Sequence, residues 1–248
     1  MSVISIINQK GGVAKTTTAV NVAHAWAKRG KKVLLIDLDP QASATKSVFG
    51  DREFDYTSFD LVANKIGVKQ IIQHSDNFGC DVIPGEILLS GIDIHLAAQF
   101  GREKFLRKSL TPIKANYDKI IIDCSPTLGL LTVNALMASD EIVIPICPEY
   151  FSLKGIDLIL DTLKNIRTGL GHEVKVKGII ITRFKNRKVI KSVIQEVEDR
   201  YGLKVFKDYI PDNIAVEEAH HNHLPVSKYA PRSKAGKAYE ALAEELIL

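Results

Sequence analysis

The stretch that decides the fold lies near the start of the chain, where an apolar, β-branched run from Val3 to Asn8 leads into a glycine pair and a Lys-Thr-Thr triplet. The full stretch is Lys10-Gly11-Gly12-Val13-Ala14-Lys15-Thr16-Thr17, and a helical pattern follows it. Glycines in this order let backbone amides close around phosphate oxygens, while the helix N-terminus and the Lys15 ammonium add positive charge. The Thr16 hydroxyl is suited to a magnesium ion. The stretch therefore predicts a phosphate-binding loop.

This loop departs from the plain phosphate-loop pattern GxxxxGK[ST] at two positions. Gln9 stands at the first glycine of that pattern and Ala14 at the second. A glycine-rich turn that binds nothing is the alternative interpretation. The strand before the glycines and the helix after them are the context that the motif requires, and they favour phosphate binding.

Short apolar runs alternate with helical patterns along the chain, as in a parallel sheet covered by helices. We expect strands at Val3–Asn8, Lys32–Asp37, Cys80–Ile83, Lys119–Asp123, Glu141–Ile146 and Val176–Thr182. We expect helices at Thr16–Arg29, Ile92–Lys108, Leu131–Ala138, Leu153–Thr168, Val189–Tyr201 and Lys234–Ile247. No repeat and no linker rich in Gly, Ser or Pro divides the sequence. Residues 1–248 are therefore predicted to form one doubly wound α/β domain, with a mostly parallel sheet and helices on both faces.

The composition excludes several classes of protein. With 248 residues, 46% of them hydrophobic and 25% charged, the chain is neither fibrous nor disordered. Cys80, Cys124 and Cys147 have no CxxC spacing and lie in apolar stretches, which predicts reduced, buried thiols. The sequence has no signal-peptide pattern and no apolar run of about eighteen residues, so we expect a soluble, cytoplasmic protein. The formal charge of +4 permits binding to nucleic acid without requiring it.

Three aspartates follow or end predicted strands. Asp37 and Asp39 come at the end of the second strand, and Asp123 ends another apolar strand. In doubly wound sheets the carboxyl ends of the strands open onto the ligand crevice, so these carboxylates are expected to face the phosphates. A single aspartate at a strand end more often caps the next turn, but three beside a phosphate loop favour a metal and water site.

The motifs together resemble the deviant Walker A box of the ParA/MinD group of ATPases, in which Lys10 matches the second, signature lysine. The resemblance covers nearly the whole chain and points to the short ParA or Soj type, which starts directly at the loop. Its segments are Lys10–Thr17, Val33–Gln41, Ile120–Thr132, Glu149–Phe151 and Tyr229–Lys234.

The resemblance implies ATP and Mg²⁺ as cofactors and a slow ATPase stimulated by a partner protein. Lys15 and Thr16 would hold the β/γ-phosphates and magnesium, Asp123 would hold the metal through its water shell, and Asp39 would orient the attacking water. Asp37 would be a metal-shell or switch partner. Lys10 would reach the nucleotide of a second subunit, so that ATP favours a sandwich homodimer and hydrolysis releases it. The implied catalytic residues are Lys10, Lys15 and Asp39; the loop residues that bind nucleotide are Gly11, Gly12, Val13, Ala14, Lys15, Thr16 and Thr17.

By the same resemblance, the base lies against Thr182, Arg183, Ile210, Pro211 and Asp212. Adenine is carried over from the family, since these residues do not by themselves choose it over guanine. Two positions depart from the family pattern. Ala14 replaces the usual glycine, where a methyl group is tolerated if the residue has a helix-like φ and otherwise slows nucleotide exchange or hydrolysis. Ser125 replaces the first proline of a Pro-Pro pair, so the loop after Asp123 is expected to be less rigid.

Two basic clusters are candidate DNA-binding sites. The first contains Lys185, Arg187 and Lys188, and the second contains Arg232 and Lys234. Such clusters are often only solvated faces, but clustered cations also bind DNA phosphates without reading sequence. The ParA family binds non-specific DNA around these regions, although Asp212 and Ala215 stand where relatives commonly carry arginines. His220, His221 and His223 are expected in a surface loop, because no cysteine or acid cluster completes a metal-ligand set beside them.

Three functions fit these features. The first is an ATPase that binds DNA, associates with the nucleoid in its ATP state and positions or segregates a plasmid, chromosome origin or protein organelle through an adaptor or centromere-binding protein. The second is a MinD-like membrane ATPase, which the acidic residues Glu240, Glu244 and Glu245 of the last helix disfavour, so that no membrane partner is expected. The third is an iron–sulfur carrier, which would need two interface cysteines per chain. We favour the first.

Overall fold

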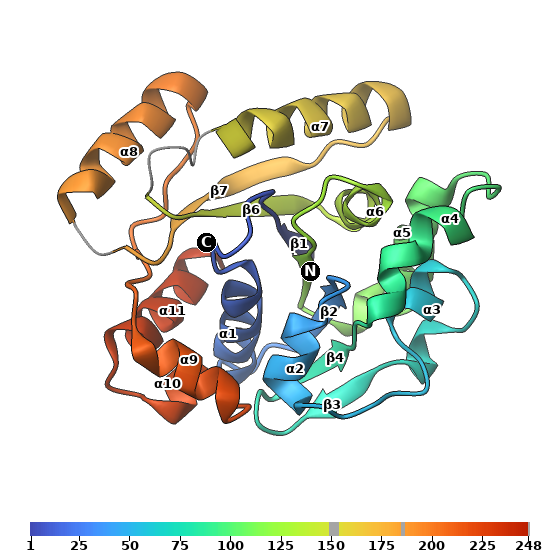
Figure 1. Cartoon of the computed structure of the whole chain (residues 1–248), viewed down its shortest axis with the longest axis horizontal. Helices are drawn as coiled ribbons and strands as arrows, with labels where there is room; N and C mark the ends of the chain where they lie inside the picture. Colours follow the sequence, from blue (N-terminus) through green and yellow to red (C-terminus); the bar gives the residue numbers. More distant parts are fainter. Residues whose placement is uncertain (149–153, 185–186, 248) are drawn as a thin grey trace.

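Seven strands form one sheet within residues 1–148, 154–184 and 187–247, the part of the chain that the computed structural model describes (Figure 1). Their order across the sheet is β3-β4-β2-β5-β1-β6-β7, and only β3 is antiparallel to its neighbour among them. The strands are β1 (Ser2–Ile6), β2 (Val33–Leu38), β3 (Gln73–Ser75), β4 (Cys80–Ile83), β5 (Lys119–Cys124), β6 (Glu141–Ile146) and β7 (Lys175–Ile181). All six predicted strands are confirmed to within one or two residues at each end. β3 was not predicted, because this three-residue edge strand has no apolar run.

Helices cover both faces of the sheet, which confirms the predicted doubly wound fold (Figure 1). They are α1 (Lys15–Lys28), α2 (Ser43–Phe49), α3 (Ser58–Val62), α4 (Ile92–His95), α5 (Phe105–Leu110), α6 (Leu130–Ala138), α7 (Lys154–Leu170), α8 (Arg187–Tyr201), α9 (Ile214–His221), α10 (Val226–Tyr229) and α11 (Lys234–Glu245). Alternate residues of one strand enter opposite layers: Ile4 belongs to the buried cluster that contains Trp26 of α1, whereas Val3 belongs to the cluster that contains Leu106 of α5. The strands are apolar on both sides because each side meets a helix layer.

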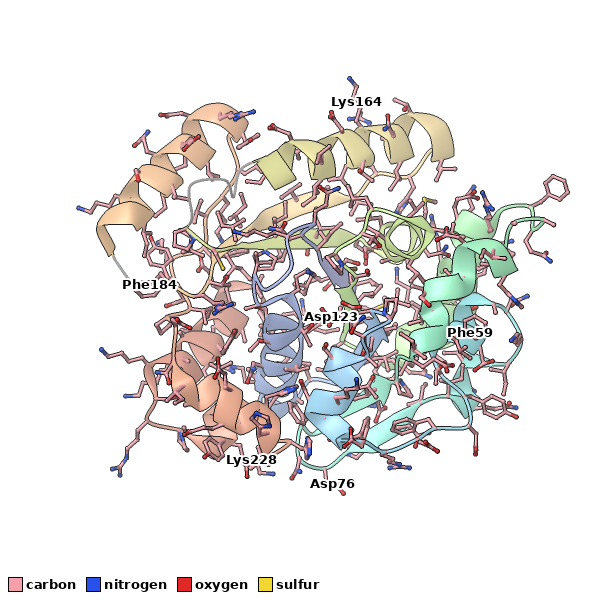
Figure 2. The ribbon with its side chains drawn as sticks, in the orientation of Figure 1. Phe59, Asp76, Asp123, Lys164, Phe184 and Lys228 are labelled. Carbon is pink, nitrogen blue, oxygen red and sulfur yellow. The ribbon has the colours of Figure 1, made fainter. Side chains whose placement is uncertain are left out.

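The register of the central strands brings the site together. Asp37 of β2 pairs with Asp123 of β5, and Asp123 pairs with Ile6 of β1. The phosphate loop leaves the end of β1 next to Asp123, and Asp37 lies one strand farther along. Figure 2 accordingly has Asp123 deep in the middle of the view, whereas Lys164 and Lys228 lie at the rim.

The prediction of one helix from Ile92 to Lys108 is wrong. The helix α4 ends at His95, a short 3₁₀ turn spans Arg102–Lys104, and α5 begins only at Phe105. Gly101 between them has a φ of 68°, a left-handed conformation that no α-helix contains. The Arg102 guanidinium donates to the Leu96 and Ala97 carbonyls and holds this break.

The last helix is part of the core. Tyr239 and Leu242 of α11 and the following Leu246 are buried in one cluster with residues of α1, and the Trp26 indole donates to the Ala243 carbonyl at 2.8 Å. On the outer side, Arg29 pairs with Glu240 at 2.9 Å and with Glu244 at 2.6 Å. Among the described helices, none is long and apolar enough to cross a membrane.

Candidate nucleotide site

The loop between β1 and α1 is held from behind by side chains of other strands and loops. The Asn8 amide donates to the Pro145 carbonyl at 2.7 Å, and its oxygen accepts from the Lys10 backbone N–H at 2.9 Å. The buried Thr182 hydroxyl lies 3.0 Å from the Val13 carbonyl. Gly11 and Gly12 are exposed at the tip, and Gly12 has a φ of 72°. The loop therefore has a fixed base and an open tip, as a phosphate cradle requires.

Ala14 does not have the helix-like φ under which its methyl group would be tolerated. Its φ and ψ are 61° and 34°, in the left-handed region, directly before the first residue of α1. A residue with a Cβ atom in this region costs about 1–2 kcal/mol relative to right-handed geometry. The loop thus requires glycine-like geometry at a position where this chain has alanine.

The two lysines of the loop have opposite environments. Lys15 is only 7% exposed, and its ammonium donates to the Lys10 carbonyl at 3.3 Å. Burial lowers the pKa of Lys15, while the carboxylates of Asp123 and Asp39 oppose this shift. Lys10 is exposed at the loop tip. One cation therefore lies beside the buried acids, and the other faces solvent.

Asp123 has the properties expected of a metal-binding carboxylate. It is fully buried, and among the described residues no donor reaches either carboxylate oxygen in good hydrogen-bond geometry. Burial and then the neighbouring Asp37 raise its pKa well above the usual range, whereas Thr16 and Lys15 favour the ionised form. Native proteins seldom leave a buried polar group without a partner. Its oxygens, the Thr16 hydroxyl and nucleotide phosphates form the all-oxygen set that Mg²⁺ prefers, so the residues fit this ion.

Asp37 is engaged by its own chain. One carboxylate oxygen accepts from the backbone N–H and the hydroxyl of Thr45 at 2.8 and 2.7 Å, and the other accepts from the Asp39 N–H at 3.1 Å. Burial, the largest cause, raises the pKa of Asp37 to about 6. These bonds tie α2 to the carboxyl end of the interior strand β2, which fits a switch role better than direct metal binding. Thr45 was not predicted, and only its place one turn after the Asp37–Gln41 segment could have indicated it.

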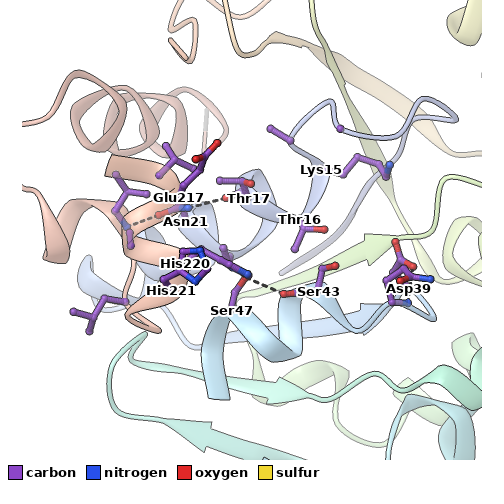
Figure 3. A pocket seen from close by; sticks show the side chains of 18 of the residues that line it. Lys15, Thr16, Thr17, Asn21, Asp39, Ser43, Ser47, Glu217, His220 and His221 are labelled. Atoms are coloured by element: carbon purple, nitrogen blue, oxygen red, sulfur yellow. Dashed lines mark hydrogen bonds between the residues drawn. The ribbon is translucent and has the colours of Figure 1, made fainter. Parts of the chain in front are cut away.

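Asp39 faces the hollow beside the loop. We call this hollow, of about 530 Å³, the phosphate hollow; it is lined by Gly11, Gly12, Lys15, Thr16, Thr17, Asp39 and, farther along, by residues of α2 and α9. Asp39 is 8% exposed, and its carboxylate accepts from the Gln41 N–H at 3.0 Å. Figure 3 shows Asp39, Lys15 and Thr16 around one end of the hollow and Glu217 and His220 at the other.

The residues predicted to hold the base also lie together. A second hollow, of about 220 Å³, is lined by Gly12, Ala14, Thr17, Arg183, Ile210, Pro211, Asp212, Asn213, Val216, Glu217 and Tyr239, and we call it the base hollow. The Arg183 guanidinium donates to the Gly12 carbonyl at 3.0 Å and lies 3.8 Å from the Asp212 carboxylate. Thr182 is fully buried, and its hydroxyl contacts the Val13 carbonyl of the phosphate loop.

Two histidines lie outside the predicted surface loop. His220 and His221 belong to helix α9, and His223 follows it. The His220 imidazole lies 2.6 Å from the Ser47 hydroxyl, which itself donates to the Ser43 carbonyl, so His220 donates this bond. His223 donates to the Lys46 carbonyl at 3.0 Å. The end of α9 and the residues after it are therefore hydrogen-bonded to α2. In the described part of the chain, no group of three or more His, Cys, Asp or Glu is placed to hold a metal ion.

The remaining predicted positions vary in how far the structure describes them. Arg187 and Lys188 begin α8, and the exposed Arg232 and Lys234 lie just before and at the start of α11. Lys185 and the motif Glu149–Phe151 lie outside the described residues. Ser125 is buried, and its hydroxyl lies 3.2 Å from that of Thr127 in the loop after Asp123. None of the three cysteines forms a disulfide, and all three are buried, as predicted.

A glycine loop, a buried lysine and strand-end carboxylates on a doubly wound sheet define a P-loop ATPase. A family model described as an AAA domain matches residues 1–176. The Bacillus subtilis sporulation initiation inhibitor protein Soj is 40% identical over 98% of this chain and 97% of its own length. The Treponema pallidum chromosome-partitioning ATPase Soj is 38% identical over 97% and 95%. The chain belongs to this Soj/ParA family of partitioning ATPases, as its motifs predicted.

A solved structure supports the same nucleotide chemistry. Cobyrinic acid a,c-diamide synthase from Mycobacterium smegmatis, with a bound ATP analogue and magnesium, is 30% identical. Its TM-score is 0.87, over 100% of this chain and 94% of that one. ATP and Mg²⁺ are the cofactors that the family resemblance implied.

Proposed function

We propose that this chain acts as an ATP-dependent dimer that positions or segregates a plasmid, chromosome origin or protein organelle. In this dimer, Lys10 of each subunit contacts the nucleotide held by the other. The observation that carries the proposal is the opposite placement of two lysines in one loop. Lys15 is buried beside Asp123 and Asp39 and serves its own nucleotide, whereas Lys10 is exposed at the loop tip, where a second subunit can approach. ATP then becomes part of the dimer contact, and its hydrolysis dissolves that contact.

Within this proposal, Asp123 and Thr16 hold magnesium and Asp39 orients water toward the terminal phosphate. The base lies between Arg183 and Pro211. Phosphoryl transfer needs positioning and charge neutralisation more than covalent chemistry, and buried charges beside a loop supply both. This role fits Asp39, because its side chain borders the phosphate hollow and its carboxylate accepts a hydrogen bond from the Gln41 N–H.

The two lysines give the sharpest test. Lys15→Ala is expected to abolish ATP binding, whereas Lys10→Ala is expected to bind ATP and remain monomeric. Calorimetry measures the first property and light scattering the second. Normal ATP-dependent dimers of Lys10→Ala would contradict the role across the interface. Asp39→Ala is expected to bind ATP, dimerise and persist as a dimer, and turnover at the parent rate would assign the water to another group.

We propose that the ATP dimer binds non-specific DNA through the segments around Arg187 and around Lys234. The helices α8, α10 and α11 lie at the same end of the molecule (Figure 1), which supports a common surface. A two-fold dimer doubles the cations on such a surface and therefore the counterions released on binding. DNA affinity should then require ATP and should fall linearly with the logarithm of salt concentration.

Charge reversal tests this surface. Arg232→Glu with Lys234→Glu should abolish DNA binding by the ATP-bound Asp39→Ala protein and leave ATP binding unchanged. Glu at the start of α11 suits the helix N-terminus, so the fold should tolerate it. Lys31→Glu with Lys32→Glu is the matched control, because these exposed residues precede β2 and belong to neither proposed segment. Equal losses in both variants would indicate a diffuse charge effect, and no loss in the first would move the surface elsewhere.

The membrane alternative has less support. A membrane anchor at the C-terminus would need a free apolar face on α11, whereas Tyr239, Leu242 and Leu246 are buried against α1. We propose that the cargo is selected by an adaptor or centromere-binding protein, with the ATP form associated with the nucleoid. Co-sedimentation with anionic vesicles distinguishes the two, since only a membrane ATPase would bind them in an ATP-dependent way.

A further inference from the structure

The phosphate hollow and the base hollow share one wall. The residues that line both are Gly12, Ala14, Thr17, Val216 and Glu217. The first three belong to the loop and the start of α1, and the last two belong to α9. If the base lies in one hollow and the phosphates in the other, the ribose that links them must cross this wall. The residues of this wall would then contact the ribose.

We propose that Glu217 accepts hydrogen bonds from the ribose hydroxyls and makes the site selective for ribonucleoside triphosphates over their 2′-deoxy counterparts. It is the acidic side chain among the residues that line both hollows. Vicinal hydroxyls are paired donors, and a carboxylate offers two acceptor oxygens for them. The same pairing between an acid and ribose hydroxyls occurs in dinucleotide-binding folds. This inference rests on the proposed position of the base.

The backbone around Glu217 is fixed before any ligand binds. The Asn213 side chain caps α9 by accepting from the Ala215 N–H at 3.0 Å. Ala215 and Ala219 are buried, so α9 is anchored on the face opposite its exposed acid. At the far end, His220 donates to Ser47 of α2. Figure 3 shows Glu217 beside Thr17 at the edge of the phosphate hollow. The carboxylate is thus held near the loop by packed helix contacts.

The charge of Glu217 offers a second argument. ATP is an anion, and a carboxylate on the wall of its site repels the phosphates unless it forms compensating bonds. Ribose hydroxyls are the part of the nucleotide that can supply these bonds. Removal of the charge therefore separates two outcomes: weaker ATP binding if the hydroxyl bonds dominate, and tighter binding if repulsion dominates.

The test compares ATP with dATP on matched variants of one helix. Glu217→Gln keeps the side-chain size and removes the charge, and Glu218→Gln makes the same change at the exposed neighbour that lines neither hollow. Affinities for each nucleotide with Mg²⁺ are measured by calorimetry on Lys10→Ala protein, so that dimerisation does not contribute. Circular dichroism confirms that each variant is folded.

The parent is expected to bind ATP about 10-fold more tightly than dATP, since a charge-assisted bond to a hydroxyl is lost. Glu217→Gln should lower ATP affinity about 10-fold and dATP affinity much less, and Glu218→Gln should change neither. Equal losses for both nucleotides, no loss, or tighter ATP binding would overturn the role of Glu217. Lys15→Ala provides the separate check on the proposed function: if it bound both nucleotides normally, the nucleotide site itself would be wrong.

Discussion

The phosphate side of the site and its base side are built in opposite ways. On the phosphate side, Lys15 and Asp39 are nearly buried, and Asp37 and Asp123 are fully buried at positions set by strand register. On the base side, Arg183 and Glu217 are exposed and belong to connecting segments and a short surface helix. Buried charges are costly without partners, whereas exposed ones cost little. The buried charges of the phosphate side therefore lower the stability of the fold while they preorganise the site, whereas the exposed charges of the base side have little effect on stability.

The largest difference between the two sides is expected from one chemical change made on each. Asp123→Asn should lower magnesium-dependent turnover about 1,000-fold, because the buried carboxylate that fits the metal is gone. It should also raise the free energy of unfolding of the nucleotide-free protein by about 1 kcal/mol, since a fully buried carboxylate whose ionised form is disfavoured by burial is removed. Steady-state kinetics and urea denaturation measure the two effects.

Asp212→Asn is the matched change on the base side. Asp212 is exposed, and its carboxylate lies 3.8 Å from the Arg183 guanidinium. The substitution should therefore shift the free energy of unfolding of the protein by less than about 0.5 kcal/mol. Turnover should stay within about twofold of the parent, because the residue lies away from the reacting phosphate. Similar losses of activity in both aspartate variants would contradict the division into two sides.

The pH dependence of stability gives the next largest effect. The pKa of Asp37 is about 6 in the folded protein, raised by burial from 3.8. The folded state thus binds this proton more tightly, so the contribution to stability is complete below pH 3.8 and is lost as pH rises through 6. The loss is about 3 kcal/mol, at 1.4 kcal/mol per unit. Urea denaturation at pH 4 and pH 7 should show the parent losing this much relative to Asp37→Asn; parallel curves would mean that Asp37 is not buried as a charge.

His220, at the far end of the phosphate hollow from Asp39, should make stability respond to pH in the opposite direction and less strongly. Burial, then the neighbouring His221 and His223, lowers the pKa of His220 below 6.5. The neutral imidazole that donates to Ser47 is therefore favoured in the fold, and stability from this group is lost as pH falls below 6.5. His220→Gln should remove this acid sensitivity, measured as the shift in thermal midpoint between pH 7 and pH 5.5. An unchanged shift in the variant would assign the sensitivity to other groups.

The same division decides what the sequence could predict. The apolar strands, the loop and the strand-end acids follow from local patterns, because a strand buried on both sides must be apolar and its end must open onto the crevice. The break at Gly101, the clasp of α2 by His220 and the support of Val13 by Thr182 depend on contacts between distant segments. No local pattern encodes such contacts, so they had to come from the structure, and the residues of the base side came from family resemblance.

The smallest effect is expected at Ala14, which lines both hollows and so borders both sides. Ala14→Gly relieves a left-handed alanine but adds freedom to the unfolded chain, which offsets part of the gain. The free energy of unfolding should rise by about 0.5–1 kcal/mol. Ala42, before α2 with a φ of 51°, is the matched control, since it is also left-handed but lines neither hollow.

Denaturation of both glycine variants separates strain from function at this wall. Ala42→Gly should gain similar stability and leave nucleotide kinetics unchanged, whereas Ala14→Gly should also speed nucleotide exchange, measured by stopped-flow fluorescence. A methyl group on the wall restricts the loop while the phosphates and the ribose enter or leave, and glycine removes that restriction. If only Ala42→Gly gained stability, the strain at Ala14 would be relieved elsewhere in the loop. If neither variant changed exchange, the loop conformation would not limit nucleotide entry, and the base side would set its rate.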